Sequence, residues 1–77
     1  MKSFSITLST VNAVKNFAKL TNEQDFEIDL ISGRYIIDAK SIMGIFSIDL
    51  SKPIQVEIHA NDAECAEFCE KIKSFIV

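Results

Sequence analysis

Apolar and polar residues alternate along three stretches of the chain, residues 4–8, 26–30 and 54–58. Such an alternation with period two is typical of a β-strand with one buried face. A further apolar run begins at Tyr35, directly after Ser32-Gly33, which is a turn signal between strands. The pattern predicts four strands, with the second and third paired as an antiparallel hairpin. The residues expected on the buried faces are Phe4, Ile6, Leu8, Phe26, Ile28, Leu30, Ile54, Val56 and Ile58.

Between the first two of these stretches the apolar spacing changes to that of a helix. Ser9 or Thr10 can cap this helix at its start, and Asn22 can end it. A last helix is expected after Asn61, which with Glu64 forms a pattern like a capping box. The expected inner faces are Val11, Val14, Phe17, Ala18 and Thr21 in the first helix, and Cys65, Cys69, Ile72 and Ile76 in the last, with Ala66 and Phe68 beside them.

A short apolar segment, residues 41–46, lies before the fourth predicted strand. Ser41 can cap one or two helical turns there, and Gly44 disfavours a longer helix. The expected order is therefore strand, helix, strand, strand, short helix, strand, helix. Four strands with two long helices predict a two-layer α+β fold. At 77 residues, the chain is expected to form one domain that spans residues 1–77.

Composition and charge narrow the possible classes of function. Lys and Arg total 8 and Asp and Glu total 11, which gives a formal net charge of −3 without a dense basic cluster. This balance argues against nucleic acids and anionic membranes as partners. No apolar run approaches the roughly 20 residues of a membrane-spanning helix, so we expect a protein of the cytoplasm. The small size favours a carrier, regulator or binding module over an enzyme, and no cofactor is predicted.

The most specific segment is residues 38–47, which contains the run Lys-Ser-Ile-Met-Gly at residues 40–44. This run resembles the regulatory serine motif of HPr, the histidine-containing phosphocarrier of the bacterial sugar phosphotransferase system. The expected order of elements is also similar to that of the HPr family. The resemblance implies an open-faced β-sandwich, in which helices pack on one face of a four-stranded antiparallel sheet in the order β-α-β-β-α-β-α.

The start of the first helix departs from the family pattern. HPr carries a phosphorylatable His there, followed closely by an Arg. Counted back from Ser41 without a gap, the His position falls on Thr10 and the Arg position on Asn12. The one His of the chain is His59, in the fourth predicted strand. Because a Thr phosphate is a stable ester and the N–P bond of phosphohistidine is labile, the resemblance implies the fold without a catalytic residue for phosphoryl transfer.

Ser41 has two compatible interpretations. It can cap the short helix, and by the resemblance it is also a target for an HPr-kinase-type enzyme. The apolar side chains that follow it form a candidate docking patch, whereas Ile45 is expected in the core. The family fold implies that the starts of the first helix and the short helix lie near each other. The predicted partner-binding residues are Lys40, Ile42, Met43, Phe46 and Thr10.

Cys65, Cys69 and His59 are possible metal ligands, but three residues are fewer than the four of a typical structural site. Cysteine is among the most buried residue types, so we expect both thiols to pack in the core and no metal to bind. His59 follows the inward-facing Ile58 and is expected to point into solvent. Glu64, Glu67 and Glu70 are expected to form a solvated helix face.

Three functions fit these observations to different degrees. The first is a non-catalytic HPr-like regulatory protein that binds protein partners, such as a transcription regulator of carbon use, under control of Ser41 phosphorylation. The second is a degenerate HPr paralogue that acts as an interaction module without phosphorylation. The third is a true phosphocarrier, which the missing His and Arg oppose.

Overall fold

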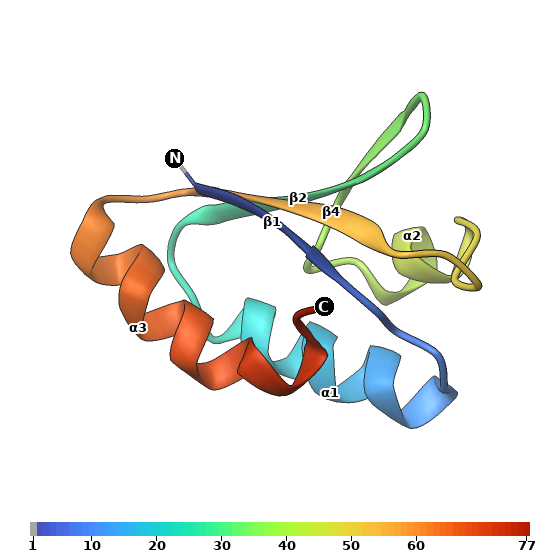
Figure 1. Ribbon diagram of the computed structural model, residues 1–77, viewed down its shortest axis with the longest axis horizontal. Coiled ribbons are helices and arrows are strands. Elements are labelled where there is room, and N and C mark those ends of the chain that lie inside the picture. The colour runs from blue at the N-terminus through green and yellow to red at the C-terminus, as the bar shows by residue number, and fades with distance from the viewer. Residues whose placement is uncertain (1) are drawn as a thin grey trace.

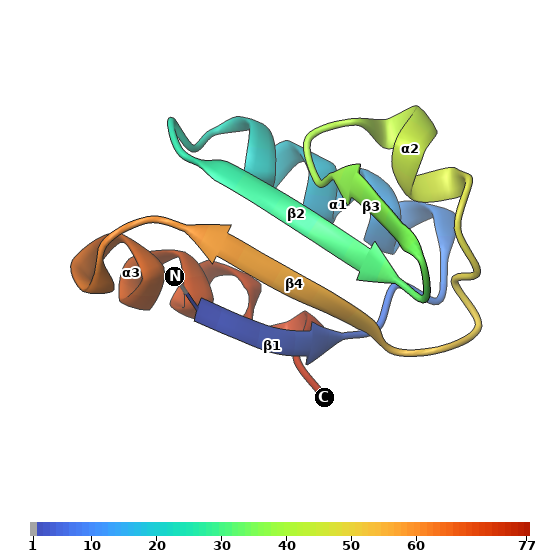
Figure 2. The same ribbon diagram turned by 90° about the horizontal axis from the view of Figure 1, so that it is seen from above.

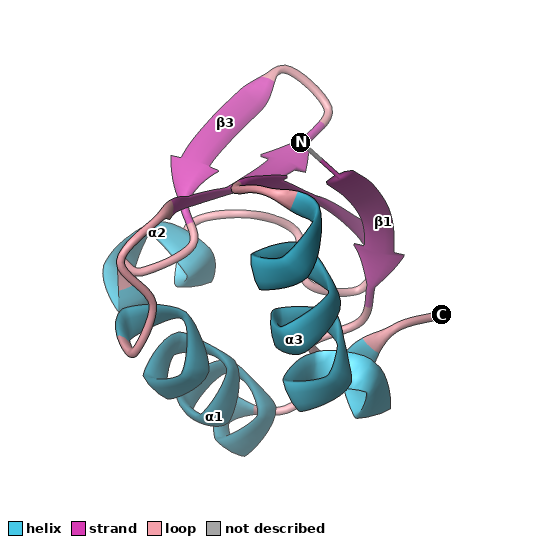
Figure 3. Ribbon diagram, turned by 90° about the vertical axis from the view of Figure 1, so that its left-hand side faces the viewer, coloured by secondary structure: helices cyan, strands magenta, loops and turns pink. Residues whose placement is uncertain are grey.

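The computed structural model describes residues 2–77, and its helices all lie on one side of a single sheet (Figures 1 and 3). The α+β class and the predicted order of elements are confirmed. The elements are β1 (Lys2–Ile6), α1 (Val11–Asn22), β2 (Glu27–Ser32), β3 (Tyr35–Asp38), α2 (Ile42–Phe46), β4 (Ile54–His59), α3 (Asp62–Ile72) and the 3-10 helix η1 (Lys73–Phe75).

The sheet has the strand order β1-β4-β2-β3, and all neighbouring strands are antiparallel (Figure 2). β2 and β3 form the predicted hairpin, in which Ser32 pairs with Tyr35. The turn between them holds Gly33 at φ 59°, a left-handed conformation that glycine adopts without steric cost. Glycine at the first central position suits a two-residue turn whose twist matches that of the flanking strands.

The core lies between the sheet and the helices. Side chains at alternate positions of β2 and β4 point into it, and the predicted inward residues Ile28, Leu30, Ile54, Val56 and Ile58 are at most 1% exposed. The prediction is less accurate for Phe4, in the middle of β1, and for Phe26, directly before β2, because both side chains are only half-buried. The opposite face of the sheet carries no helix in the described part of the chain, so its side chains meet solvent (Figure 3).

Two predicted helix caps are confirmed. The Thr10 side chain accepts a hydrogen bond from the Ala13 amide at 3.0 Å at the start of α1. At the start of α3, the Asn61 side chain accepts from the Glu64 amide at 2.8 Å, and the Glu64 carboxylate accepts from the Asn61 amide at 3.3 Å. These bonds satisfy amides that the helix itself leaves without partners, so they fix where each helix begins.

The prediction for the end of the chain is wrong in one respect. Ile76 does not continue the last helix, because α3 ends at Ile72 and η1 turns the chain back to the sheet. The Thr7 amide donates to Phe75 O at 2.9 Å, and the Val77 amide donates to Ser5 O at 3.0 Å. The last residues therefore supply hydrogen-bond partners to the outer edge of β1, which a free edge strand lacks.

Within residues 2–77, no helix is both long enough and apolar enough to cross a membrane.

Candidate functional site

Ser41 lies at the exposed start of α2 and caps it, as predicted. Its backbone is extended (φ −96°, ψ 108°), and its Oγ accepts a hydrogen bond from the Gly44 amide at 3.1 Å. The Ser41 carbonyl also accepts the first bond of the helix, from the Ile45 amide at 3.0 Å. The hydroxyl that the sequence motif marks is thus both solvent-accessible and part of the helix cap.

Gly44 has a steric role that the sequence did not reveal. A Cβ atom at this position would lie 3.3 Å from Ser41 Oγ and 3.6 Å from Ile37 Cβ. A separation of 3.3 Å is tighter than ordinary van der Waals contact, so the cap would have to move to accommodate a side chain. The Gly of the Lys-Ser-Ile-Met-Gly run therefore permits the close approach of the Ser41 hydroxyl to the helix backbone.

The last turn of α1 holds the loop that leads to α2. The Thr21 hydroxyl is completely buried and lies 2.9 Å from Ala18 O and 2.8 Å from Ala39 O. The Asn22 side-chain amide donates to Lys40 O at 2.9 Å. A buried hydrogen bond is costly to break because its partner is then left without one. The backbone directly before Ser41 is consequently anchored to the core.

These contacts locate Lys40, one of the predicted partner-binding residues. Its carbonyl is bonded to Asn22 at the end of α1, and Asn22 lies roughly 18 Å from Thr10 along the helix at 1.5 Å per residue. The Lys40 side chain is half-buried, and its ammonium group donates to Gln24 O at 2.9 Å. Lys40 therefore belongs to the anchored loop.

The other predicted docking residues are exposed. Met43 is 82% exposed, whereas Ile42 and Phe46 are 42% and 43% exposed and stand one helical turn apart. Ile45 is fully buried, as expected, and holds α2 against the core. We refer to Ile42, Met43 and Phe46 as the α2 patch.

A further apolar residue lies at the same end of the molecule as the α2 patch. Figures 1 and 2 place α2 and the first turn of α1 at this end. Val11, predicted on the inner face of α1, is instead 56% exposed in that turn. Thr10 and Asn12 are exposed beside it. At 3.6 residues per turn, Val11 lies at the edge of the buried face of α1 and not at its centre, which is formed by Val14, Phe17, Ala18 and Thr21.

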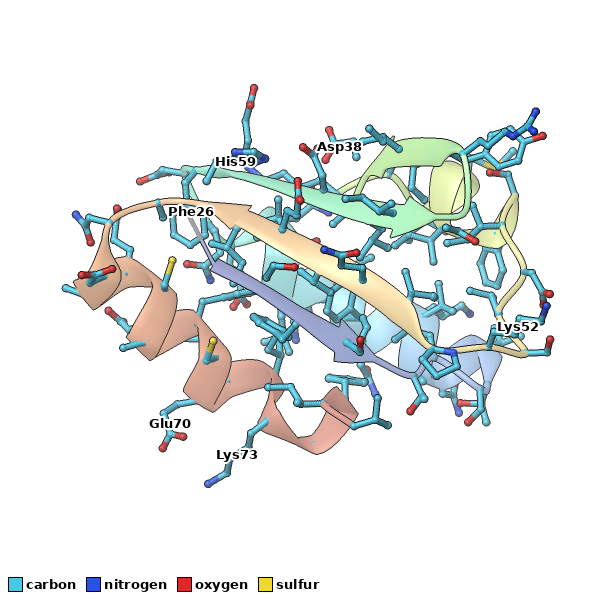
Figure 4. The ribbon with its side chains drawn as sticks, turned by 45° about the horizontal axis from the view of Figure 1, so that its top comes forward. Phe26, Asp38, Lys52, His59, Glu70 and Lys73 are labelled. Carbon is cyan, nitrogen blue, oxygen red and sulfur yellow. The ribbon has the colours of Figure 1, made fainter. Side chains whose placement is uncertain are left out.

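The three possible metal ligands of the sequence do not come together. Cys65 is buried between α3 and the sheet, and Cys69 is half-buried on the same helix. His59 points from β4 to the open face of the sheet, as Figure 4 shows. The ring is not merely solvated as expected, because its Nε2 lies 2.8 Å from Asp29 Oδ2 of β2.

Comparison with solved structures gives close matches over nearly the whole chain. Three of the matching structures are HPr proteins. That of Bacillus anthracis is 25% identical, with a TM-score of 0.72, and the match covers 99% of this chain and 94% of that one. HPr-C-His of Thermoanaerobacter tengcongensis is 20% identical (TM-score 0.75; 94% of this chain and 90% of that one). The histidine-containing phosphocarrier protein of a Mycoplasma is 23% identical (TM-score 0.70; 97% and 96%).

No curated protein sequence gives a significant match. The family model described as "PTS HPr component phosphorylation site" matches residues 10–77, which is most of the chain. HPr proteins are phosphocarriers that interact with other proteins of the phosphotransferase system and are not themselves enzymes. With the strand order, the short capped helix and this match in agreement, the chain belongs to the HPr family.

Proposed function

We propose that this chain is a regulatory, protein-binding member of the HPr family, and that phosphorylation of Ser41 controls which partner it binds. The observation that carries the proposal is the position of Ser41, an exposed hydroxyl at the start of α2, next in sequence to the exposed α2 patch. We further propose that it acts in the cytoplasm, where HPr-kinase-type enzymes and transcription regulators of carbon use are available as partners.

A phosphoryl group on Ser41 would act through its charge. It adds about −1.5 to −2 charges at pH 7 and three acceptor oxygens. Ile42 follows directly, and the whole patch lies within the five residues of α2. A partner that buries the apolar patch would have to desolvate this charge, so its affinity falls. A partner that presents Arg would gain a charge-assisted hydrogen bond, so its affinity rises.

Loss of phosphoryl transfer is the second part of the proposal. We assign Thr10 to the place of the family's His and Asn12 to that of its Arg. Neither side chain carries a positive charge that would hold a phosphoryl group. The imidazole of His59 lies on the open face of the sheet, away from α1 and α2, so it cannot take over the role at that helix start. In this proposal, the chain keeps the serine that an HPr-kinase-type enzyme phosphorylates and lacks the residues that carry the phosphoryl group in HPr.

The test is to incubate the chain with an HPr-kinase-type enzyme and ATP and to measure the intact mass. We expect one added phosphoryl group that is stable in acid. Ser41→Ala should abolish it. Ser47→Ala is the matched control, because Ser47 is an exposed serine at the other end of the same helix, and this variant should still be phosphorylated.

A second arm replaces the kinase by Enzyme I and phosphoenolpyruvate. We expect no acid-labile phosphate. A stoichiometric, acid-labile phosphate would contradict the loss of carrier activity. If the kinase arm alone fails, the chain is better described by the alternative, an HPr-like interaction module that binds partners without phosphorylation.

A further inference from the structure

The open face of the sheet carries a group of metal-ligating side chains that the family's carrier chemistry does not use. Asp29 of β2, and Glu57 and His59 of β4, alternate with the buried residues of their strands and therefore project from the face opposite the core. One donor atom from each of the three lies within 4.8 Å of the other two. In Figure 4, the labelled His59 lies on the opposite side of the ribbon from Glu70 of α3. The group is therefore separated from the helices by the sheet.

The strand register concentrates negative charge at this place. Glu57 of β4 is paired with Asp29 of β2, and Asp29 is paired in turn with Asp38 of β3. Residues directly opposite each other in an antiparallel pair project from the same face, so three carboxylates form one row across three strands. Like charges directly opposite each other destabilise a sheet. A bound cation would remove this repulsion.

Few cationic groups of the protein compensate the row. Among the described residues, this carboxylate row makes one salt bridge, between Asp29 and His59. The side chains of the two residues are 31% and 37% exposed. Lys40 lines a small hollow of about 140 Å³ together with Glu27, Asp29 and Asp38. Its ammonium group, however, donates to Gln24 O. The candidate ligands are thus an imidazole nitrogen and several carboxylate oxygens. The negative charge of these carboxylates exceeds the positive charge that nearby side chains supply.

We propose that Asp29, Glu57 and His59 bind a divalent transition-metal ion of the zinc class on the open face of the sheet. Imidazole and carboxylate are ligands that zinc accepts, whereas Mg²⁺ prefers an all-oxygen octahedral shell. Three protein ligands leave a coordination position for water, as in other open zinc sites. The bound ion would cross-link β2 to β4 and offset the charge of the carboxylate row.

The geometry requires side-chain rotation but no movement of the strands. Zinc bonds of about 2.0–2.2 Å put neighbouring ligand atoms roughly 3–3.5 Å apart, which is closer than the present spread of up to 4.8 Å. His59 is exposed, and Asp29 and Glu57 are half-buried, so their side chains have room to turn. Their Cα positions are already fixed by the ladder between β2 and β4.

The site can be tested by NMR titration of the full chain with ZnCl₂. Because His59 is the one His of the chain, the ring C–H signals report on it without ambiguity. We expect these signals and the amides of β2 and β4 to shift with ZnCl₂, and to stay unchanged with MgCl₂ at the same concentration. Absence of a His59 shift at millimolar zinc would overturn the proposal.

The zinc affinities of variants then distinguish a site with three ligands from zinc that binds to the His59 imidazole alone. Glu57→Gln should weaken the apparent zinc affinity by about 10-fold or more, since even loss of an outer partner of a metal ligand typically has an effect of 10–100-fold. Glu67→Gln, an exposed glutamate of α3, is the matched control and should leave the affinity unchanged. If Glu57→Gln and Asp29→Asn both leave the affinity unchanged, the three-ligand site is wrong. The same conclusion follows if Cys69→Ser abolishes the zinc response.

Discussion

Replacement of Ser41 by Ala tests the role of Ser41 as the cap of α2, and the test needs no binding partner. The substitution removes the Oγ that accepts from the Gly44 amide at 3.1 Å and leaves that amide to water. Loss of a Ser N-cap costs about 1 kcal/mol. For a domain of 60–100 residues, this corresponds to a fall in Tm of about 4–8 °C. Ser41→Asp should largely retain the stability, because Asp is also a good cap and its charge favours a helix start.

The measurement is thermal and urea unfolding followed by circular dichroism for both variants and for Thr10→Ala. Thr10→Ala is a matched control, because Thr10 caps α1 through the same kind of bond, to the Ala13 amide at 3.0 Å, and is also exposed. We expect Ser41→Ala and Thr10→Ala to lose similar amounts. Equal damage by Ser41→Asp and Ser41→Ala would refute the cap, since Asp supplies the same acceptor.

Further substitutions address the core, the loop anchor and the carrier site. Phe46→Ala should cost roughly 1–1.5 kcal/mol in urea unfolding, because the ring is 43% exposed, whereas the fully buried Ile45→Ala should cost about 2–5 kcal/mol. A larger loss for Phe46→Ala than for Ile45→Ala would assign the Phe46 ring to the core. Thr21→Val keeps the shape of the side chain but removes the hydroxyl contacts with Ala18 O and Ala39 O, so it should lower the free energy of unfolding by about 1–3 kcal/mol. An unchanged urea midpoint would show that this anchor contributes little. Thr10→His should not restore acid-labile phosphorylation by Enzyme I, because the Arg is still missing; a labile phosphate on this variant would show that the His alone suffices.

Features that depend on near neighbours in the chain could be predicted from the sequence. The alternation at residues 54–58 indicated which side of β4 is buried, and Thr10, Ser41 and Asn61 each precede the helix that they cap. A cap is decided by a side chain and an amide three residues later, so a short stretch of sequence contains the whole interaction. The exposure of the α2 patch followed in the same way, since a helix of five residues cannot bury every side.

Features that depend on distant segments could not be predicted. The sequence did not indicate that Asn22 would hold Lys40 O, because that bond requires the loop before α2 to return to the end of α1. The carboxylate row has the same origin, since Asp29 and Glu57 become neighbours through the register of β2 with β4. Ile76 was misplaced because its partner is the edge of β1, at the other end of the chain.

The anchoring of α2 indicates how a phosphoryl group on Ser41 would act. Buried Thr21 and the Asn22 amide hold the loop before Ser41, and Ile45 fixes the helix after it. The modified residue thus lies between two segments that contact the core, and its own side chain faces solvent. A charge added there can change the surface potential beside the α2 patch at little cost to the packing. We therefore expect phosphorylation to alter the choice of partner through electrostatics on an unchanged backbone, and the amide NMR shifts of the phosphorylated chain should differ near α2 and not across the sheet.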